Sequence, residues 1–218
     1  MAEISLLSDF GSTVSYITYI FSNSLLYPVM ILLILLVVVT LILVGEFITE
    51  YTRRNRDQMQ FEKDMQRISM IMKSSSANKT EEVISILRNL EGKQTQMVVS
   101  YSKEIKTAIE ENNINRIEKI ADTYEIKMLK RTEKTRIITT IGPMLGLMGT
   151  LIPLGPALIG LTSGNIEALA TNLVIAFATT VVGLFSAGIS FCLTTVRNRW
   201  YWQDMMDIND IIDALEAE

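Results

Sequence analysis

The chain has 218 residues, of which 49% are apolar and 20% are charged. Twenty lysine and arginine residues and 24 acidic residues give a net charge of −4, so no nucleic-acid partner is expected. The chain has no histidine and one cysteine, Cys192, which excludes Ser-His-Asp and Cys-His nucleophile systems and internal disulfides and argues against structural zinc. We therefore expect a protein that is not an enzyme and that holds no cofactor and no metal.

The apolar residues are concentrated in two long stretches. Positions 25–44 carry no charge, and positions 137–196 carry a single charged residue, Glu167. Because about 20 apolar residues cross a bilayer as a helix, the first stretch predicts one transmembrane helix and the second predicts two. The polar cluster 161–165 separates these two, with Asn165 as the N-cap of the helix that follows. We expect an all-α integral membrane protein with three transmembrane helices and long cytoplasmic helical extensions.

The lysine and arginine residues set the predicted orientation. None lies in the first 24 residues or in the short turn, 18 lie in 46–136, and Arg197 and Arg199 follow the third span. Positive residues mark the cytoplasmic side, and Trp200–Trp202 stand where an interfacial aromatic belt is expected. The predicted segments are an external amphipathic N-terminal segment (1–24), transmembrane helix 1 (25–45), a cytoplasmic helical region (46–136), transmembrane helix 2 (137–161), an external turn (162–166), transmembrane helix 3 (167–196) and a cytoplasmic C-terminal helix (197–218).

The polar region and the tail both show apolar residues at helical spacing, which predicts a cytoplasmic helical bundle. Ser74–Ser76, Gly92 and Asn112–Asn113 mark helix breaks, and Asn78 with Glu81 resembles a capping box. The predicted core residues are Phe61, Met65, Ile68, Met72, Ile105, Ile109, Ile114, Ile117, Ala121, Tyr124, Met128, Met205, Ile208, Ile211, Ile212 and Leu215. Acidic residues recur every third position beside the tail stripe, and we interpret them as a solvated face, with a docking surface as the alternative: Asp204, Asp207, Asp210 and Asp213.

Small residues line one face of each of the last two spans, whereas the first span is almost entirely Leu, Ile and Val. Such faces predict close helix packing in lipid, and the alternative is that part of them lines a pathway or holds a partner helix. The predicted packing residues are Gly142, Gly146, Gly149, Gly183 and Ala187. Three prolines in the second span each remove one backbone hydrogen bond, which predicts helix kinks or carbonyls that face a wet cavity: Pro143, Pro153 and Pro156.

The candidate ion-pathway residues are uncharged polar side chains on these two spans: Thr140, Thr150, Asn172, Thr179 and Thr180. A proton or sodium pathway usually carries an acidic residue at mid-depth, and these spans have none. Glu167 lies at the outer end, where helix capping explains it. If ions cross, the titrating carboxylate must therefore come from another chain.

Two motifs in these spans resemble those of a known family. The segment 141–150, IGPMLGLMGT, resembles the second-span motif of the TolQ/ExbB/MotA proton-channel proteins, and 176–184, AFATTVVGL, resembles their third-span motif. The resemblance implies a pentameric ring around a single-span TolR-, ExbD- or MotB-like partner that carries a membrane aspartate. It also implies that Thr150 and Thr180 are pore hydroxyls at matching depth. Ile175 stands where TolQ and ExbB carry a glutamate. In this respect the sequence is closer to the MotA pattern.

Two functions from different classes follow. The first is the channel-forming stator subunit of an ion-driven membrane motor in the cytoplasmic membrane. The alternative is a membrane-anchored helical scaffold or signalling subunit that conducts no ions. The hydroxyls on the small faces favour the channel, because a scaffold has no need of them.

Overall fold

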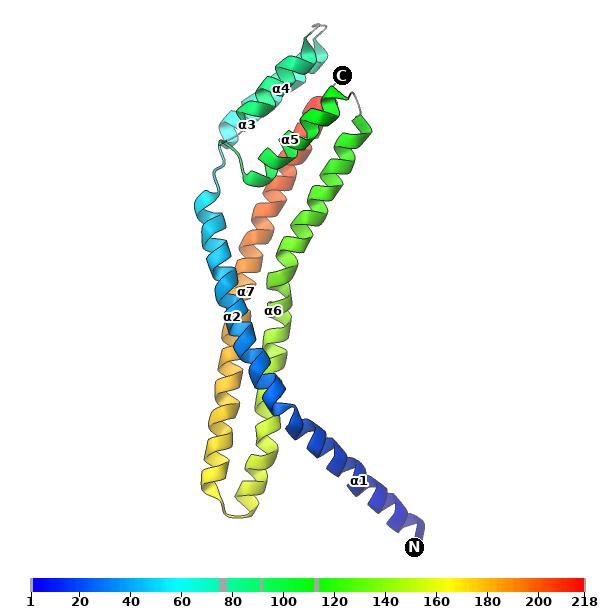
Figure 1. Ribbon diagram of the computed structural model, residues 1–218, viewed down its shortest axis with the longest axis vertical. Coiled ribbons are helices and arrows are strands. Elements are labelled where there is room, and N and C mark those ends of the chain that lie inside the picture. Colours follow the sequence, from blue (N-terminus) through cyan, green and yellow to red (C-terminus); the bar gives the residue numbers. More distant parts are fainter. Residues whose placement is uncertain (1, 75–77, 91, 112–113, 218) are drawn as a thin grey trace. The chain divides into compact units, whose positions relative to one another are not determined.

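The computed structural model describes residues 2–74, 78–90, 92–111 and 114–217, without the side chains of 2–12 and 114–115. Over these residues the chain forms helices and turns and no strand (Figure 1). The all-helical prediction is confirmed. The helices are α1 (Ala2–Ser24), α2 (Leu26–Arg53), α3 (Gln58–Lys73), α4 (Lys79–Asn89), α5 (Gln96–Glu110), α6 (Ile114–Thr162) and α7 (Ile166–Leu215).

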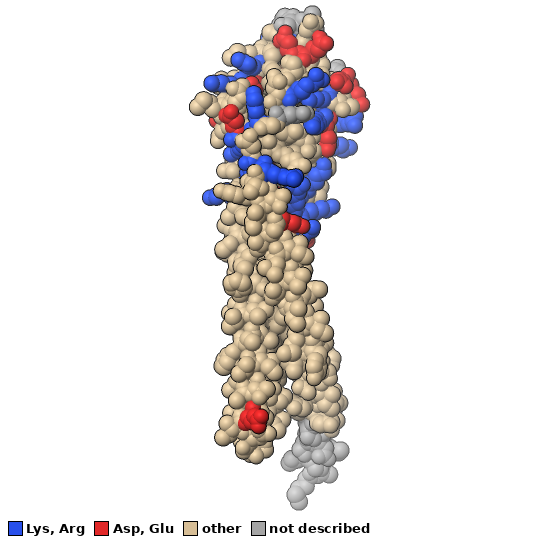
Figure 2. Space-filling model, turned by 60° about the vertical axis from the view of Figure 1, so that its left-hand side comes forward, with Lys and Arg blue, Asp and Glu red and all other residues tan. Residues whose placement is uncertain are grey.

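The chain divides into two compact units. The first, here the apolar unit, consists of Met1–Val44 and Thr135–Cys192, and the second, here the charged unit, consists of Gly45–Lys134 and Leu193–Glu218. On the face that Figure 2 shows, the Lys, Arg, Asp and Glu side chains crowd on the charged unit, and few lie on the described part of the apolar unit. Helices α2, α6 and α7 each contribute residues to both units.

Three helical stretches of the described chain are long and apolar enough to cross a membrane: Thr13–Arg53, Arg116–Thr162 and Ile166–Leu215. The first of these stretches is interrupted at Leu25, between α1 and α2 and three residues before Pro28. The interruption arises because the proline nitrogen cannot donate to the carbonyl of Ser24. Helix α2 buries only a narrow stripe and exposes most of its other Leu and Ile side chains. The stripe residues recur at spacings of three and four: Val29, Leu33, Leu36, Thr40 and Leu43.

A three-residue turn joins α6 to α7 in the apolar unit. Gly164 adopts a φ of 75°, which favours glycine. The side-chain oxygen of Asn165 accepts a hydrogen bond of 3.0 Å from the backbone N–H of Ala168, which confirms the predicted N-cap. Glu167 lies in the first turn of α7, where a negative charge is favourable.

The core of the charged unit is built from α3, α4, α5 and the charged-unit parts of α6 and α7. The predicted stripes are confirmed: their described members form this core, with Met72, Ile109 and Ile212 at its edge, while the side chain of Ile114 lies outside the described residues. The ring of Tyr101 is fully buried and meets that of Tyr124 edge-on at 5.6 Å.

The ends of the short helices agree only in part with the sequence signals. Asp57 caps α3 by accepting a hydrogen bond from the backbone N–H of Gln60. The capping box predicted at Asn78 is wrong, because the Asn78 side chain makes no capping hydrogen bond. Gly92 adopts a φ of 81° between α4 and α5. Residues 75–76 and 112–113 of the predicted breaks lie outside the described residues.

Candidate functional site

Helices α6 and α7 meet through their glycines in the apolar unit. A Cβ atom added to Gly183 would lie 2.6 Å from the carbonyl oxygen of Gly142 and 2.9 Å from the Cα of Gly146. A Cβ on Gly142 would lie 3.0 Å from that of Ala187, and one on Gly149 would lie 2.6 Å from the Thr179 hydroxyl. The small faces of the two helices therefore pack against each other, which brings the backbones into contact. We call this contact the glycine seam.

Two threonines of α7 lie on the glycine seam. Thr179 is buried, and its hydroxyl donates to the carbonyl of Ala176 at 2.8 Å. Thr180 is half-buried, and its hydroxyl oxygen lies 3.4 Å from the carbonyl oxygen of Gly146 on α6 and 3.3 Å from that of Ala176. Both of these distances are longer than a typical O–H···O hydrogen bond, so the Thr180 hydroxyl is weakly held.

The other candidate pathway residues lie away from the seam contacts and bond back to their own helices. Thr150 is half-buried, and its hydroxyl donates to the carbonyl of Leu147 at 2.7 Å. Thr140 is exposed, and its hydroxyl donates to the backbone carbonyl of Arg136 at 3.3 Å. Asn172 is half-buried, and its side-chain nitrogen donates to the backbone carbonyl of Ala168 at 2.8 Å.

The register of the hairpin corrects the expected depth of two hydroxyls. Gly146 faces Thr180, with 3.4 Å between the Thr180 Cα and a Cβ added to Gly146. Thr150 lies four residues farther along α6, about 6 Å at 1.5 Å per residue. The neighbouring contact, 2.6 Å between a Cβ added to Gly149 and the Thr179 side chain, gives only about 3 Å, so Thr150 is offset from Thr180 by about 3–6 Å along the hairpin.

The three prolines of the second span lie inside α6, which continues through all of them. Pro153 is buried, while Pro143 and Pro156 are half-buried. Each lacks a backbone N–H, so the carbonyl four residues earlier has no helical donor. These carbonyls belong to Thr139, Gly149 and Ile152, and Gly149 lies on the glycine seam.

A polar network that the sequence did not indicate joins α2 and α7 in the charged unit. Arg197 is 4% exposed, and its Nε donates to Glu50 at 3.0 Å. The Tyr201 hydroxyl donates to the other carboxylate oxygen of Glu50 at 2.7 Å. Burial, together with this bond, raises the pKa of Tyr201 to about 12.

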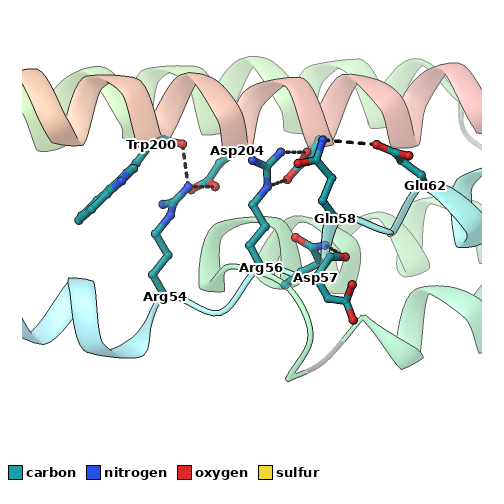
Figure 3. A network of polar contacts seen from close by, with 9 residues as sticks. Arg54, Arg56, Asp57, Gln58, Glu62, Trp200 and Asp204 are labelled. Carbon is teal, nitrogen blue, oxygen red and sulfur yellow. Dashed lines mark hydrogen bonds and ion pairs between the residues drawn. The ribbon is translucent and has the colours of Figure 1, made fainter. Parts of the chain in front are cut away.

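A second set of polar contacts lies farther along α7, where residues at the end of α2 and before the start of α3 meet it (Figure 3). Arg54 donates to Asp204 at 2.7 Å and to the backbone oxygen of Trp200 at 3.0 Å, and Arg56 pairs with Asp207 at 2.8 Å. Burial raises the pKa of the Asp204 carboxyl, and the Arg54 guanidinium opposes that shift. The hydrogen bond to Asp207 raises the pKa of Arg56.

Two predictions for the tail need correction. Asp204 and Asp207 are 2% and 3% exposed, so half of the predicted solvated face is a buried set of ion pairs, and only Asp210 and Asp213 are exposed. The aromatic cluster is also not a uniform belt, because Trp202 alone is exposed. Trp200 stacks on Phe47 at 5.1 Å and lies under the Arg54 guanidinium. The cluster of Arg53, Arg54 and Arg56 just after the first span was the signal that could have pointed to these acids.

The fold and this geometry are those of a helical membrane protein that crosses the bilayer several times, with three apolar helices and a charged helical unit. A family model described as the MotA/TolQ/ExbB proton channel family matches residues 46–206, more than half of the chain. The chain therefore belongs to the MotA/TolQ/ExbB proton channel family, whose members are channel and energy-transducing proteins, not enzymes. A search of the curated proteins finds no match.

Proposed function

We propose that this chain is the channel-forming stator subunit of a motor driven by H⁺ or Na⁺. Its partner is a TolR-, ExbD- or MotB-like subunit with one membrane span and an aspartate in that span. Ion passage then turns one subunit against the other and performs mechanical work. The family membership supports the channel, and the pattern of polar groups in α6 and α7 supports the need for a partner.

The observation that carries this proposal is the Thr180 hydroxyl at the edge of the glycine seam. It is half-buried and weakly held by two carbonyls, so it can turn toward a carboxylate that enters beside it. A hydroxyl donates to a charged carboxylate and accepts from a protonated one, without a fixed charge of its own. The 60 residues 137–196 hold one acidic residue, Glu167, close to the turn, so the titrating group comes from the partner.

The proposed assembly is a ring of five copies in the cytoplasmic membrane, with the N-terminus and the α6–α7 turn outside and the C-terminus in the cytoplasm. The distribution of Lys and Arg supports this orientation. The exposed Leu and Ile side chains of α2 suit contact with lipid at the outside of the ring. Thr150 and Thr180 border the partner helix, with Thr140, Asn172 and Thr179 as further polar positions.

Native mass spectrometry of the detergent-solubilised chain should show a closed oligomer, and a stable monomer would contradict the ring.

The test is Thr180→Val, which keeps the size of the side chain and removes its hydroxyl. Leaving a buried polar group without one donor costs about 1–3 kcal/mol, so ion flux through the assembled complex should fall about tenfold or more. Thr150→Val should weaken the flux less, because Thr150 is offset by about 3–6 Å along the hairpin and its hydroxyl is held by the Leu147 carbonyl at 2.7 Å. Thr180→Ser should retain much of the flux because its hydroxyl survives.

The matched control is Thr171→Val, also on α7. The Thr171 hydroxyl is exposed and donates to the carbonyl of Glu167 at 2.9 Å, so its loss should leave flux unchanged. Flux and the assembly of both subunits are measured in the same cells. Full flux in the Thr150→Val/Thr180→Val double variant would assign both hydroxyls to helix packing and favour the scaffold without ion conduction.

A further inference from the structure

A cavity of about 690 Å³ opens in the charged unit beside the Glu50 network. Its walls come from the end of α2, the start of α5, the α6 segment just before the second span and the α7 segment just after the third. Six basic side chains line it: Arg53, Arg54, Lys130, Arg131, Lys134 and Arg197. Three carboxylates also line it, from Glu46, Glu50 and Asp204.

The carboxylates do not neutralise this cavity. Glu50 pairs with Arg197 at 3.0 Å, Glu46 lies 4.0 Å from the same guanidinium, and Asp204 pairs with Arg54. All three acids are therefore engaged with two arginines. Within the part of the chain that the structure describes, the remaining four cations have no carboxylate partner: Arg53, Lys130, Arg131 and Lys134. Four unpaired positive charges around one cavity favour an anionic occupant.

The position along the chain indicates where this anion comes from. Arg197 follows the last residue of the uncharged stretch, and Lys134 lies three residues before the second span, which is about 5 Å along a helix. The polar headgroup layer adds roughly 5–8 Å to each side of the hydrocarbon core. Both side chains are thus at headgroup depth, and Lys130 and Arg131 lie about one turn farther from the core.

We propose that this cavity binds the headgroup of an anionic phospholipid from the cytoplasmic leaflet. The phosphodiester oxygens accept hydrogen bonds from Arg131, Lys134 and their unpaired neighbours, which a zwitterionic headgroup would engage less because its own ammonium group cancels the charge. The cavity is large enough for a headgroup with two phosphates. The site goes beyond the proposed ion pathway and does not depend on ion flow.

The experiment measures lipid retention on the full-length chain purified in detergent and stripped of lipid. The chain is incubated with equal amounts of a diphosphatidylglycerol and a phosphatidylcholine, and bound lipid is counted by native mass spectrometry. We expect the wild type to retain the anionic lipid about tenfold more than the zwitterionic one. Arg131→Gln/Lys134→Gln should reduce that retention about tenfold, and Lys134→Arg should preserve it.

The matched control removes two charges at the same border of the membrane but outside the cavity. Arg136 and Arg199 are exposed, adjoin the apolar spans and do not line the cavity. Retention by Arg136→Gln/Arg199→Gln should stay within about twofold of the wild type. An equal loss of lipid retention in the two double variants would mean that the anionic lipid is attracted diffusely to the positive charges, and it would overturn the site. The proposal would also be overturned if the wild type retained no anionic lipid, for example because a neighbouring copy of the chain fills the cavity.

A second arm separates the lipid from free phosphate. Inorganic phosphate is added at the concentration of the lipid and above it, with the melting temperature of each variant as a check that it folds. Unchanged lipid retention supports a headgroup site. Displacement of the lipid by an equal concentration of phosphate would overturn the lipid assignment. Because the partner subunit and ion flux are absent from the assay, its outcome is independent of the proposed channel.

Discussion

At the scale of single residues, the pairing of Asp204 shows how burial changes the role of a charge. The residue belongs to a regular acidic series, yet its side chain is 2% exposed and bonds to Arg54. Arg54 in turn stacks over the Trp200 ring at 5.1 Å, so one guanidinium is held by a carboxylate, a backbone carbonyl and an aromatic face. The residues joining α2 to α3 are thereby fastened to α7.

Removal of one partner of this pair should destabilise the fold strongly. Arg54→Met leaves the buried Asp204 carboxylate without its cation, which costs about 3–5 kcal/mol. The free energy of unfolding, measured with denaturant on the detergent-solubilised chain, should fall accordingly. Arg54→Met/Asp204→Leu should recover much of the loss, because no buried charge is left. Asp213→Asn, at an exposed position, is the control and should change little.

Tyr201 predicts a response to alkaline pH. Its pKa of about 12 lies above the ordinary 10.0 because the phenol is buried and donates to Glu50. Below pH 10 the hydroxyl keeps its proton in both the folded and the unfolded chain. Between pH 10 and 12 only the unfolded chain ionises, so this contribution to stability is lost as pH rises through that range. Tyr201→Phe should flatten this part of the stability curve, and an unchanged slope would contradict the assignment.

At the scale of elements, the α6–α7 hairpin is held by backbone contact rather than by large side chains. A Cβ added to Gly142 or Gly183 would lie 2.8 Å or 2.6 Å from a backbone oxygen of the facing helix, whereas one added to Gly146 would touch the Thr180 backbone at 3.4 Å. In lipid, where burial of apolar surface drives little association, such close approach is the main source of attraction between helices. The seam is therefore the part of the hairpin most sensitive to added volume.

Gly183→Ala tests this sensitivity with one methyl group. The new Cβ would lie 2.6 Å from the Gly142 carbonyl oxygen, and backbone cannot swing away as a flexible side chain can. Overpacking of this kind costs about 1–3 kcal/mol, so thermal unfolding in detergent should occur at a lower temperature. Gly188→Ala is the matched control on α7, because no atom lies within 4 Å of its added Cβ. Equal effects of the two substitutions would mean that helix propensity, not packing, decides the result.

At the scale of the whole molecule, charge is divided between two units. The described side chains of the apolar unit include two charged ones, Arg136 and Glu167, whereas charged side chains crowd on the face of the charged unit that Figure 2 shows. A charged group in the hydrocarbon region costs several kcal/mol, whereas loops rich in Lys and Arg stay in the cytoplasm. The division therefore supports one orientation in the membrane over its opposite.

This orientation can be tested by labelling single cysteines. The one native thiol, Cys192, is first replaced by serine. Ser163→Cys in the α6–α7 turn should react with a membrane-impermeant maleimide in intact cells. Asn209→Cys, on the exposed side of α7 in the charged unit, should react only after the membrane is permeabilised. The reverse pattern would invert the proposed topology.

The sequence by itself determined the helical class, the three apolar stretches, the N-cap at Asn165 and the apolar stripes of the charged unit. These features depend on composition and on the 3.6-residue period, which are local properties of the chain. The matches at 141–150 and 176–184 likewise sufficed to indicate the family that residues 46–206 confirm.

Only the tertiary structure decided which faces meet. The offset of Thr150 from Thr180 depends on the register of the hairpin, and the small faces alone did not specify whether they pack on each other or on neighbours. Periodicity placed Asp204 and Asp207 on one side of a helix but did not show that Arg54 and Arg56, about 150 positions earlier in the chain, cover that side. Pairings at such separations depend on how the helices pack, because no local pattern links the two partners.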